Sequence, residues 1–146
     1  MALIDDIAAG PVALDTVAFI YFLEEHPRFL PVVEPLFSAI ARGRLRAVTS
    51  TLTLLETLVV PLRAGDLALA ARYEAILSRS RHLKLVDLGR EVLRGAAALR
   101  AATRIKTPDA LQISTALLGR CTAFVTNDRR LPAIDGLRVL QLSAYA

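Results

Sequence analysis

Short apolar runs alternate with longer segments of helical periodicity along the 146 residues of the chain. Runs of strand length lie at residues 11–15, 45–49, 83–86, 122–126 and 137–140. Helical patterns lie between them, at residues 16–25, 31–42, 50–62, 66–78, 87–103 and 107–118. Strands that are separated by helices and are nearly all apolar predict a parallel sheet covered on both faces. We therefore expect one three-layer α/β domain over residues 1–146, with a central parallel sheet of about five strands.

Individual residues predict where several of these helices begin and end. Pro27 should close the first helix, because proline lacks a backbone donor and disfavours a helical residue before it. Ser50 or Thr51 should cap the third helix, which Pro61 is expected to bend or end near Leu62, and Asp87 should cap the fifth. The sequence Thr107-Pro108-Asp109 predicts another helix start, with a hydroxyl at the cap and an acid near the positive end of the dipole.

The composition is apolar enough to raise the question of a membrane protein, with 54% hydrophobic residues and a mean hydropathy of +0.46. However, the longest stretch without a charged side chain is the ten residues 110–119, whereas a spanning helix needs about 20. The N-terminus carries Asp5 and Asp6 where a signal peptide has basic residues. The single cysteine, Cys121, cannot form an internal disulfide. We therefore expect a cytoplasmic protein that does not enter a membrane.

The charge balance favours a polyanionic partner. Eighteen Lys and Arg residues stand against 14 Asp and Glu residues, which gives a formal charge of +4. Such a balance suits the binding of nucleic-acid phosphates, and it suits solubility equally well. Charge alone therefore does not choose between these two interpretations.

Four acids fall where the predicted sheet would bring them to one edge. Asp15 ends the first strand, Asp128 follows the fourth, Asp109 opens the helix before the fourth, and Glu56 lies in the helix after the second. Ligands of parallel sheets bind beyond the carboxyl ends of the strands. Clustered carboxylates repel one another, so a cation or shared protons must offset the repulsion. Oxygen donors without a nearby histidine or cysteine favour Mg²⁺ or Mn²⁺ over zinc.

These acids suit the metal-assisted hydrolysis of a phosphodiester. We expect Asp15 and Asp109 to bind the metal directly, Asp128 to supply a further ligand, and Glu56 to hold a metal-bound water or act as a base. The nearest polar side chains should orient waters and carboxylates, and they are Thr16, Thr126 and Asn127. The arginines next to the last acid are candidate phosphate contacts, and they are Arg129 and Arg130.

Each acid taken singly also has an ordinary structural explanation. Asp109 fits a first-turn acid on a helix dipole, worth about 0.3–1 kcal/mol. Asp15 and Asp128 fit loop or cap positions. Glu56 lies in a strongly apolar helix, where a carboxylate facing the core would be costly. Asp87 also follows a strand, but a cap role accounts for it, so it is left out of the site.

The motifs together resemble a known family, the PIN domain. They are Val12-Ala-Leu-Asp15-Thr16, the Glu56 helix, Thr107-Pro108-Asp109-Ala110-Leu111 and Phe124-Val-Thr126-Asn127-Asp128. Each motif is short, but the ordered set of four is specific and covers almost the whole chain. Within the family, the chain looks most like the VapC-type toxins of toxin–antitoxin pairs.

The resemblance implies Mg²⁺- or Mn²⁺-dependent endonucleolytic cleavage of RNA, frequent dimers, and a small antitoxin protein that blocks the pocket. The family's acidic quartet falls on Asp15, Glu56, Asp109 and Asp128, with its polar neighbours at Thr16 and Thr126. The chain departs from many relatives after Asp128, where Arg129-Arg130-Leu131 replaces a segment with an aromatic residue.

Two other interpretations stay open. One is a housekeeping RNA-processing nuclease with the same chemistry, which a neighbouring antitoxin-like reading frame would argue against. The other is a catalytically silent PIN fold that binds RNA or protein, which a metal titration would test. Residues 52–62 and 66–78 also carry more leucine than one buried face requires, so we expect a homodimer.

Overall fold

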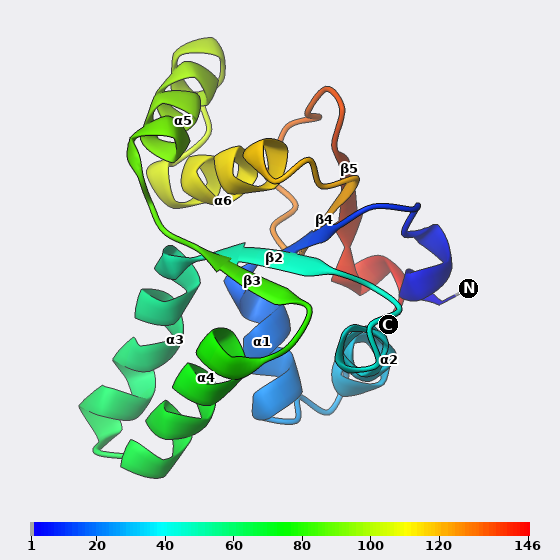
Figure 1. Cartoon of the computed structure of the whole chain (residues 1–146), viewed down its shortest axis with the longest axis vertical. Helices are drawn as coiled ribbons and strands as arrows, with labels where there is room; N and C mark the ends of the chain where they lie inside the picture. The colour runs from blue at the N-terminus through cyan, green and yellow to red at the C-terminus, as the bar shows by residue number, and fades with distance from the viewer. Residues whose placement is uncertain (1) are drawn as a thin grey trace.

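Five parallel strands form the centre of the molecule (Figure 1). The computed structural model describes residues 2–146. The strands are β1 (Val12–Leu14), β2 (Ala47–Ser50), β3 (Leu83–Val86), β4 (Ala123–Thr126) and β5 (Arg138–Gln141). Their order in the sheet is β3-β2-β1-β4-β5, and every neighbouring pair is parallel. The predicted five-stranded parallel sheet is therefore confirmed.

Six α-helices and two short 3₁₀ helices connect and flank the strands. The α-helices are α1 (Thr16–Leu23), α2 (Leu30–Ala41), α3 (Thr51–Ala64), α4 (Leu67–Arg79), α5 (Arg90–Ala102) and α6 (Thr107–Leu118). The 3₁₀ helices are η1 (Leu3–Asp6) and η2 (Leu142–Ala144). None of the helices within residues 2–146 combines the length and the apolar character needed to cross a bilayer.

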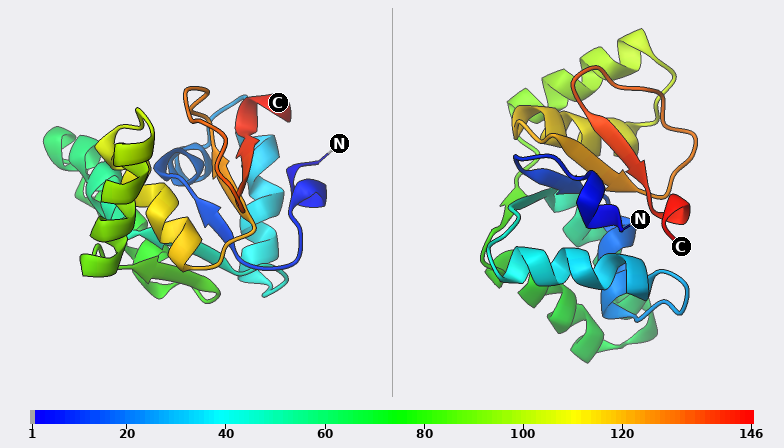
Figure 2. Two further views of the ribbon diagram at one scale, coloured as in Figure 1. Left: turned by 90° about the horizontal axis from the view of Figure 1, so that it is seen from above. Right: turned by 90° about the vertical axis from the view of Figure 1, so that its right-hand side faces the viewer.

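The sheet separates two hydrophobic cores, which gives the three layers seen in Figure 2. Val12 and Leu14 of β1 face the core under α1, α2 and α4. Ala13 between them faces the opposite core, where Phe124 of β4 packs with Ile113 of α6. This alternation follows from the two-residue period of a strand. Helix α5 packs chiefly on α6, outside the sheet, so the predicted three-layer α/β domain is confirmed.

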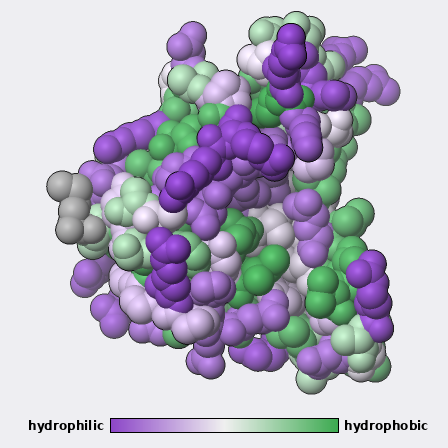
Figure 3. Space-filling view, turned by 180° about the vertical axis from the view of Figure 1, so that it is seen from behind, coloured by the Kyte–Doolittle hydropathy of each residue, from purple (hydrophilic) through white to green (hydrophobic). Residues whose placement is uncertain are grey.

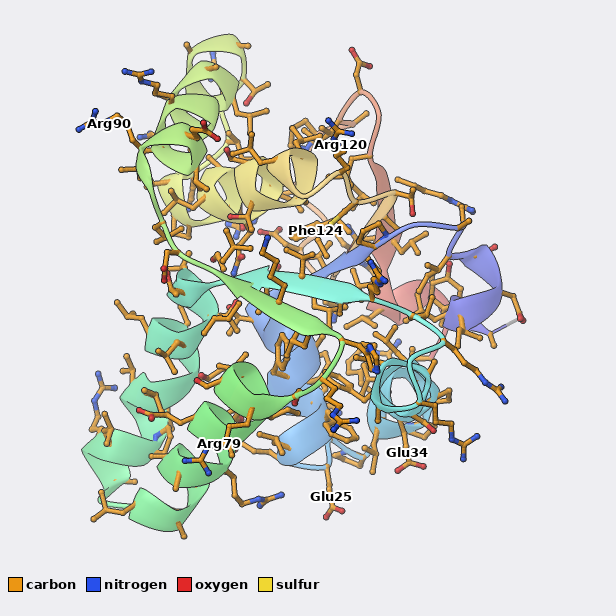
Figure 4. The ribbon with its side chains drawn as sticks, viewed as in Figure 1. Glu25, Glu34, Arg79, Arg90, Arg120 and Phe124 are labelled. Atoms are coloured by element: carbon orange, nitrogen blue, oxygen red, sulfur yellow. The ribbon has the colours of Figure 1, made fainter. Side chains whose placement is uncertain are left out.

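The labelled side chains in Figure 4 show how charge is kept out of these cores. Glu25 and Glu34 project from the lower edge of the molecule and Arg90 from its side, whereas Phe124 lies among the strands. Phe124 is 1% exposed. The acids described below are therefore exceptions, because they lie close to the interior.

Three predicted helix boundaries are wrong. Pro61 does not end α3, which continues to Ala64 and is closed by Gly65, at φ +70°, in the left-handed region. Asp87 does not cap α5, since the Gly89 N–H turns back to its carbonyl and Gly89 takes the cap position. Thr107 does not cap α6, because it is already the first helical residue and Lys106 precedes it without a capping bond.

Candidate active site

The order of the strands reverses between β1 and β4, and two site residues lie on either side of this reversal. Asp15 follows β1 directly and Thr126 ends β4. The Thr126 hydroxyl donates to Asp15 Oδ2 at 2.7 Å, and the Thr16 N–H donates to Oδ1 at 2.8 Å. The Thr126 oxygen in turn accepts the Asp128 N–H at 3.1 Å. Thr126 therefore connects the first and last of the four acids.

Opposing effects act on the pKa of the Asp15 carboxyl. Burial raises the pKa of its carboxyl above the usual value, and the negative charges of Glu56 and Asp128 add to the rise. The hydrogen bonds from Thr126 and Thr16 act in the opposite direction, because they favour the carboxylate. Thr126 and Thr16 thus hold the buried Asp15 carboxyl close to Glu56 and Asp128.

Asp109 approaches from the first turn of α6. Burial raises its pKa to about 6, with further contributions from Asp128 and Asp15, and Arg130 partly offsets the rise. A rise that neighbouring carboxylates contribute to means that the three aspartates lie close enough to repel one another. Asp15, Asp109 and Asp128, from three separate segments, are therefore brought together.

Arg130 pairs with Asp128 at the outer side of the site. Its Nε and Nη2 lie 3.1 and 3.2 Å from the two carboxylate oxygens, and its backbone N–H donates to Oδ1 at 2.9 Å. These hydrogen bonds from Arg130 lower the pKa of Asp128. The Arg130 side chain is 73% exposed and that of Asp128 20%. Arg129 instead donates to Ser143 Oγ at 3.0 Å, so the two arginines point to different partners.

Glu56 joins the site through Thr16. The Thr16 hydroxyl donates to Glu56 Oε1 at 2.6 Å, while the Thr16 N–H donates to Asp15. One residue therefore holds two of the four acids. Glu56 Oε2 accepts no hydrogen bond from residues 2–146, which leaves it available to a water or a ligand.

Asn127 has a different role from the one expected. Its amide donates to the Tyr21 hydroxyl at 3.1 Å, and its side-chain oxygen accepts the Ser143 N–H at 3.1 Å. It makes no hydrogen bond with the four acids in the described part of the chain. Asn127 thus ties the end of the chain to α1 and lines the site without orienting a carboxylate.

Four buried polar residues beneath the acids do not appear among the residues predicted from the motifs, and they are Thr49, Ser50, Thr53 and Gln112. Their spacing from the acids along the sequence could have indicated two of these residues. Thr53 lies three residues before Glu56 and Gln112 three residues after Asp109, so each shares a helix face with an acid. Polar residues at that spacing in apolar helices indicate support for the acids.

A shallow pocket of about 350 Å³ opens beside Asp15 and Asp128, whereas Glu56 and Asp109 do not line it. It is lined by Asp15, Val17, Tyr21, Asn127, Asp128 and Arg130. A larger cavity of about 840 Å³ lies elsewhere, beside β2, β3 and the start of α5. The smaller pocket is the relevant one, because three of its lining residues are Asp15, Asp128 and Arg130.

The donor set fits a hard divalent cation, since every candidate ligand is a carboxylate oxygen and neighbouring carboxylates contribute to the raised pKa values of Asp15 and Asp109. In the arrangement seen across residues 2–146, no three acidic, histidine or cysteine side chains lie close enough to hold one ion. Both carboxylate oxygens of Asp128 bond to Arg130. A cation that uses Asp128 must therefore compete with that arginine.

A family model for the PIN domain matches residues 12–137. The chain belongs to the PIN-domain family. The match includes all four acids, and the resemblance seen in the sequence motifs is confirmed. Comparison with curated protein sequences finds no match.

Solved structures of toxin–antitoxin proteins share the fold of this PIN domain. VapBC2 from Rickettsia felis, bound to a promoter DNA fragment, aligns with a TM-score of 0.70 and 19% identity, over 90% of this chain and 98% of that one. A toxin–antitoxin complex from Klebsiella pneumoniae gives 0.65 and 20%, over 86% and 94%. Mycobacterium tuberculosis VapC20, a toxin that cleaves the sarcin–ricin loop, gives 0.65 and 15%, over 82% and 91%.

Proposed function

We propose that this PIN domain is a metal-dependent endoribonuclease that hydrolyses RNA phosphodiester bonds, and that it acts as the toxin of a toxin–antitoxin pair. The convergence of Asp15, Asp109 and Asp128 where the strand order reverses carries the proposal. Mutually repelling carboxylates at that place favour a bound cation. Family membership supports the same conclusion.

The side chains of the site have different roles in the proposed reaction. Asp15 and Asp109 would bind the metal directly and Asp128 would supply a further ligand, which requires the three carboxylates to move closer together than they lie here. Bound Mg²⁺ or Mn²⁺ supplies charge neutralisation at the phosphodiester and lowers the pKa of a coordinated water. Thr126 and Thr16 hold the Asp15 oxygens in place. Glu56 would hold a metal-bound water or act as the base, through the Oε2 atom that accepts no hydrogen bond from residues 2–146.

RNA phosphates are expected to meet Arg130 first. Its side chain is largely exposed and stands at the mouth of the pocket. Arg129 does not line the pocket and donates to Ser143, so it is expected to be a weaker phosphate contact. The net charge of +4 adds a long-range attraction for a polyanion.

The proposed protein partner is a small antitoxin that covers the pocket. The support is the fold shared with chains from toxin–antitoxin complexes of Rickettsia felis and Klebsiella pneumoniae. Copurification with the product of the neighbouring gene, followed by loss of RNA cleavage in the complex, tests this partner.

A homodimer is proposed from the apolar outer surface of α3 and α4. Leu55, Val60 and Leu62 of α3 and Leu67 of α4 are each more than half exposed. Figure 3 shows hydrophobic surface gathered over this part of the molecule, at the lower right. Contiguous exposed apolar surface of this kind usually has a partner. Light scattering that gives a monomer mass would contradict the dimer.

The decisive experiment measures cleavage of structured RNAs with Mg²⁺ or Mn²⁺. Cleavage should disappear with a chelator and return with the metal. Asp15→Asn and Asp109→Asn should abolish it in folded protein. Asp87→Asn is the matched control, because Asp87 also follows a strand at the same sheet edge but lies outside the pocket. Cleavage that persists with a chelator would contradict the metal mechanism.

A further inference from the structure

Five buried polar side chains form a hydrogen-bonded network beneath Asp15 and Glu56. They are Thr16 of α1, Thr49 and Ser50 of β2, Thr53 of α3 and Gln112 of α6. None carries a charge, and Gln112 is only 3% exposed. A buried amide is costly unless its donors and acceptor are paired, so the direction of each hydrogen bond is informative.

The bonds of Ser50 fix the orientation of the Gln112 amide. The Ser50 oxygen accepts the Leu52 N–H at 3.2 Å and donates its own proton to Gln112 Oε1 at 2.9 Å. The amide nitrogen Nε2 therefore faces Thr53 Oγ1 at 2.8 Å and Thr16 Oγ1 at 3.4 Å. A flipped amide would leave the Ser50 proton without this acceptor.

The remaining hydroxyl protons then have defined directions. The Thr49 hydroxyl donates to the Leu14 carbonyl at 2.9 Å, so the 2.7 Å bond between Thr49 and Thr53 uses the proton of Thr53. The Thr16 hydroxyl has two acceptors in reach. One is the Thr53 oxygen at 3.3 Å, which already accepts the amide proton, and the other is Glu56 Oε1 at 2.6 Å.

We propose that Gln112 is a positioning residue that directs the Thr16 hydroxyl proton to Glu56. By donating to Thr53, the amide takes one of the two lone pairs of the competing acceptor and makes that oxygen a weaker acceptor for the Thr16 proton. By donating to Thr16, the amide also polarises that hydroxyl. Glu56 is thereby held beside Asp15. The kinetic consequence rests on the proposed nuclease function, whereas the hydrogen-bond geometry does not.

Gln112→Met tests the proposal, because methionine has a similar length and no donor. Without the amide proton, the Thr53 oxygen becomes a stronger competitor for the Thr16 proton, so kcat for RNA cleavage should fall roughly tenfold, with KM almost unchanged. The control is Ser114→Ala. Ser114 is equally buried on α6, but its hydroxyl donates to the Val92 carbonyl at 2.8 Å, away from the acids, and kcat should stay unchanged.

A second substitution distinguishes positioning from simple packing. In Gln112→Met combined with Thr53→Val, the competing acceptor is gone, and the Thr16 hydroxyl has only Glu56 in reach. The double variant should recover most of the lost kcat. A double variant slower than Gln112→Met, or a single variant with the kcat of the Ser114→Ala protein, would overturn the proposal.

The kinetics of a second Gln112 variant and a crystal structure of Gln112→Met test the proposal further. If Gln112→Met does not fold, Gln112→Glu keeps the size, places two acceptor oxygens at the amide position, and should lower kcat by drawing the Thr16 proton away. A crystal structure of the Met variant should show Thr16 Oγ1 outside hydrogen-bonding distance of Glu56, and a retained bond overturns the inference. Wild-type protein that cleaves no RNA with Mg²⁺ or Mn²⁺ overturns the nuclease function alone.

Discussion

The acidic site has an inner half and an outer half that are held in different ways. In the inner half, Asp15 and Glu56 accept hydrogen bonds from N–H and hydroxyl groups, and the hydroxyls that donate to them, on Thr16 and Thr126, are buried. In the outer half, Asp128 is paired with Arg130, whose side chain is largely exposed. Buried hydrogen bonds fix one geometry, whereas exposed ion pairs are weak and exchange readily. The inner half is therefore preorganised, and the outer half is the part that can open to a cation or a phosphate.

Replacing an acid in each half should give the largest difference in RNA cleavage between the two halves. Asp15→Asn removes the buried carboxylate and turns one of its oxygens into a donor facing Thr16 or Thr126. We expect RNA cleavage to fall by about 10³-fold or more. Asp128→Asn, in the exposed half, should cost about tenfold less, because it leaves the inner geometry intact. Single-turnover rates of the two folded variants measure this, and equal losses would contradict the division into two halves.

Asp109 lies between the halves, and its raised pKa predicts a stability effect. Its pKa of about 6 in the folded chain is above the usual value of 3.8. The folded state therefore binds more protons between these values, and the wild type loses stability as the pH rises from about 4 to 6. At pH 7.5, Asp109→Asn should raise the free energy of unfolding by about 1 kcal/mol, after discounting for solvent screening of a half-buried group.

Denaturant unfolding of Asp109→Asn and wild type at pH 7.5 and pH 4 measures this difference. The gain should vanish at pH 4, where the wild-type carboxyl is largely protonated in the folded state and the repulsion is relieved. Asp87→Asn, on an exposed acid, serves as the control and should change little at either pH. An Asp109→Asn protein less stable than wild type at pH 7.5 would show that the carboxylate is held by favourable contacts.

The sequence predicts the sheet, which the structure confirms, and it predicts the sheet edge at which the acids lie, because both depend on simple regularities. Short apolar runs between helical segments predict parallel strands, and residues after parallel strands share one edge. That rule alone predicts that Asp15 and Asp128 lie at the same edge of the sheet. Asp109 was placed by the local chemistry of a helix start, even though the predicted cap at Thr107 was wrong.

The bonds around the acids could not be predicted in the same way. Gln112 and Thr53 are 59 residues apart in sequence, and their contact depends on the packing of α6 against α3. No periodicity gives the relative register of two helices to a fraction of an ångström. Asn127 points to Tyr21 and Ser143 because of the path of the last segment of the chain. Hydrophobic patterns therefore predict which residues meet, but they do not predict which hydrogen bonds form.

The smallest expected effect concerns Arg130, and it tests whether this arginine competes with the metal for Asp128 in the outer half. Arg130→Gln removes the charge that competes for Asp128 and also removes a phosphate contact. The Mn²⁺ concentration for half-maximal cleavage should fall about two- to threefold, while KM for RNA rises by a similar factor. Arg129→Gln is the matched control, since Arg129 contacts Ser143, and it should leave the Mn²⁺ requirement unchanged. A higher Mn²⁺ requirement in Arg130→Gln would mean that the arginine holds Asp128 ready for the metal rather than competing with it.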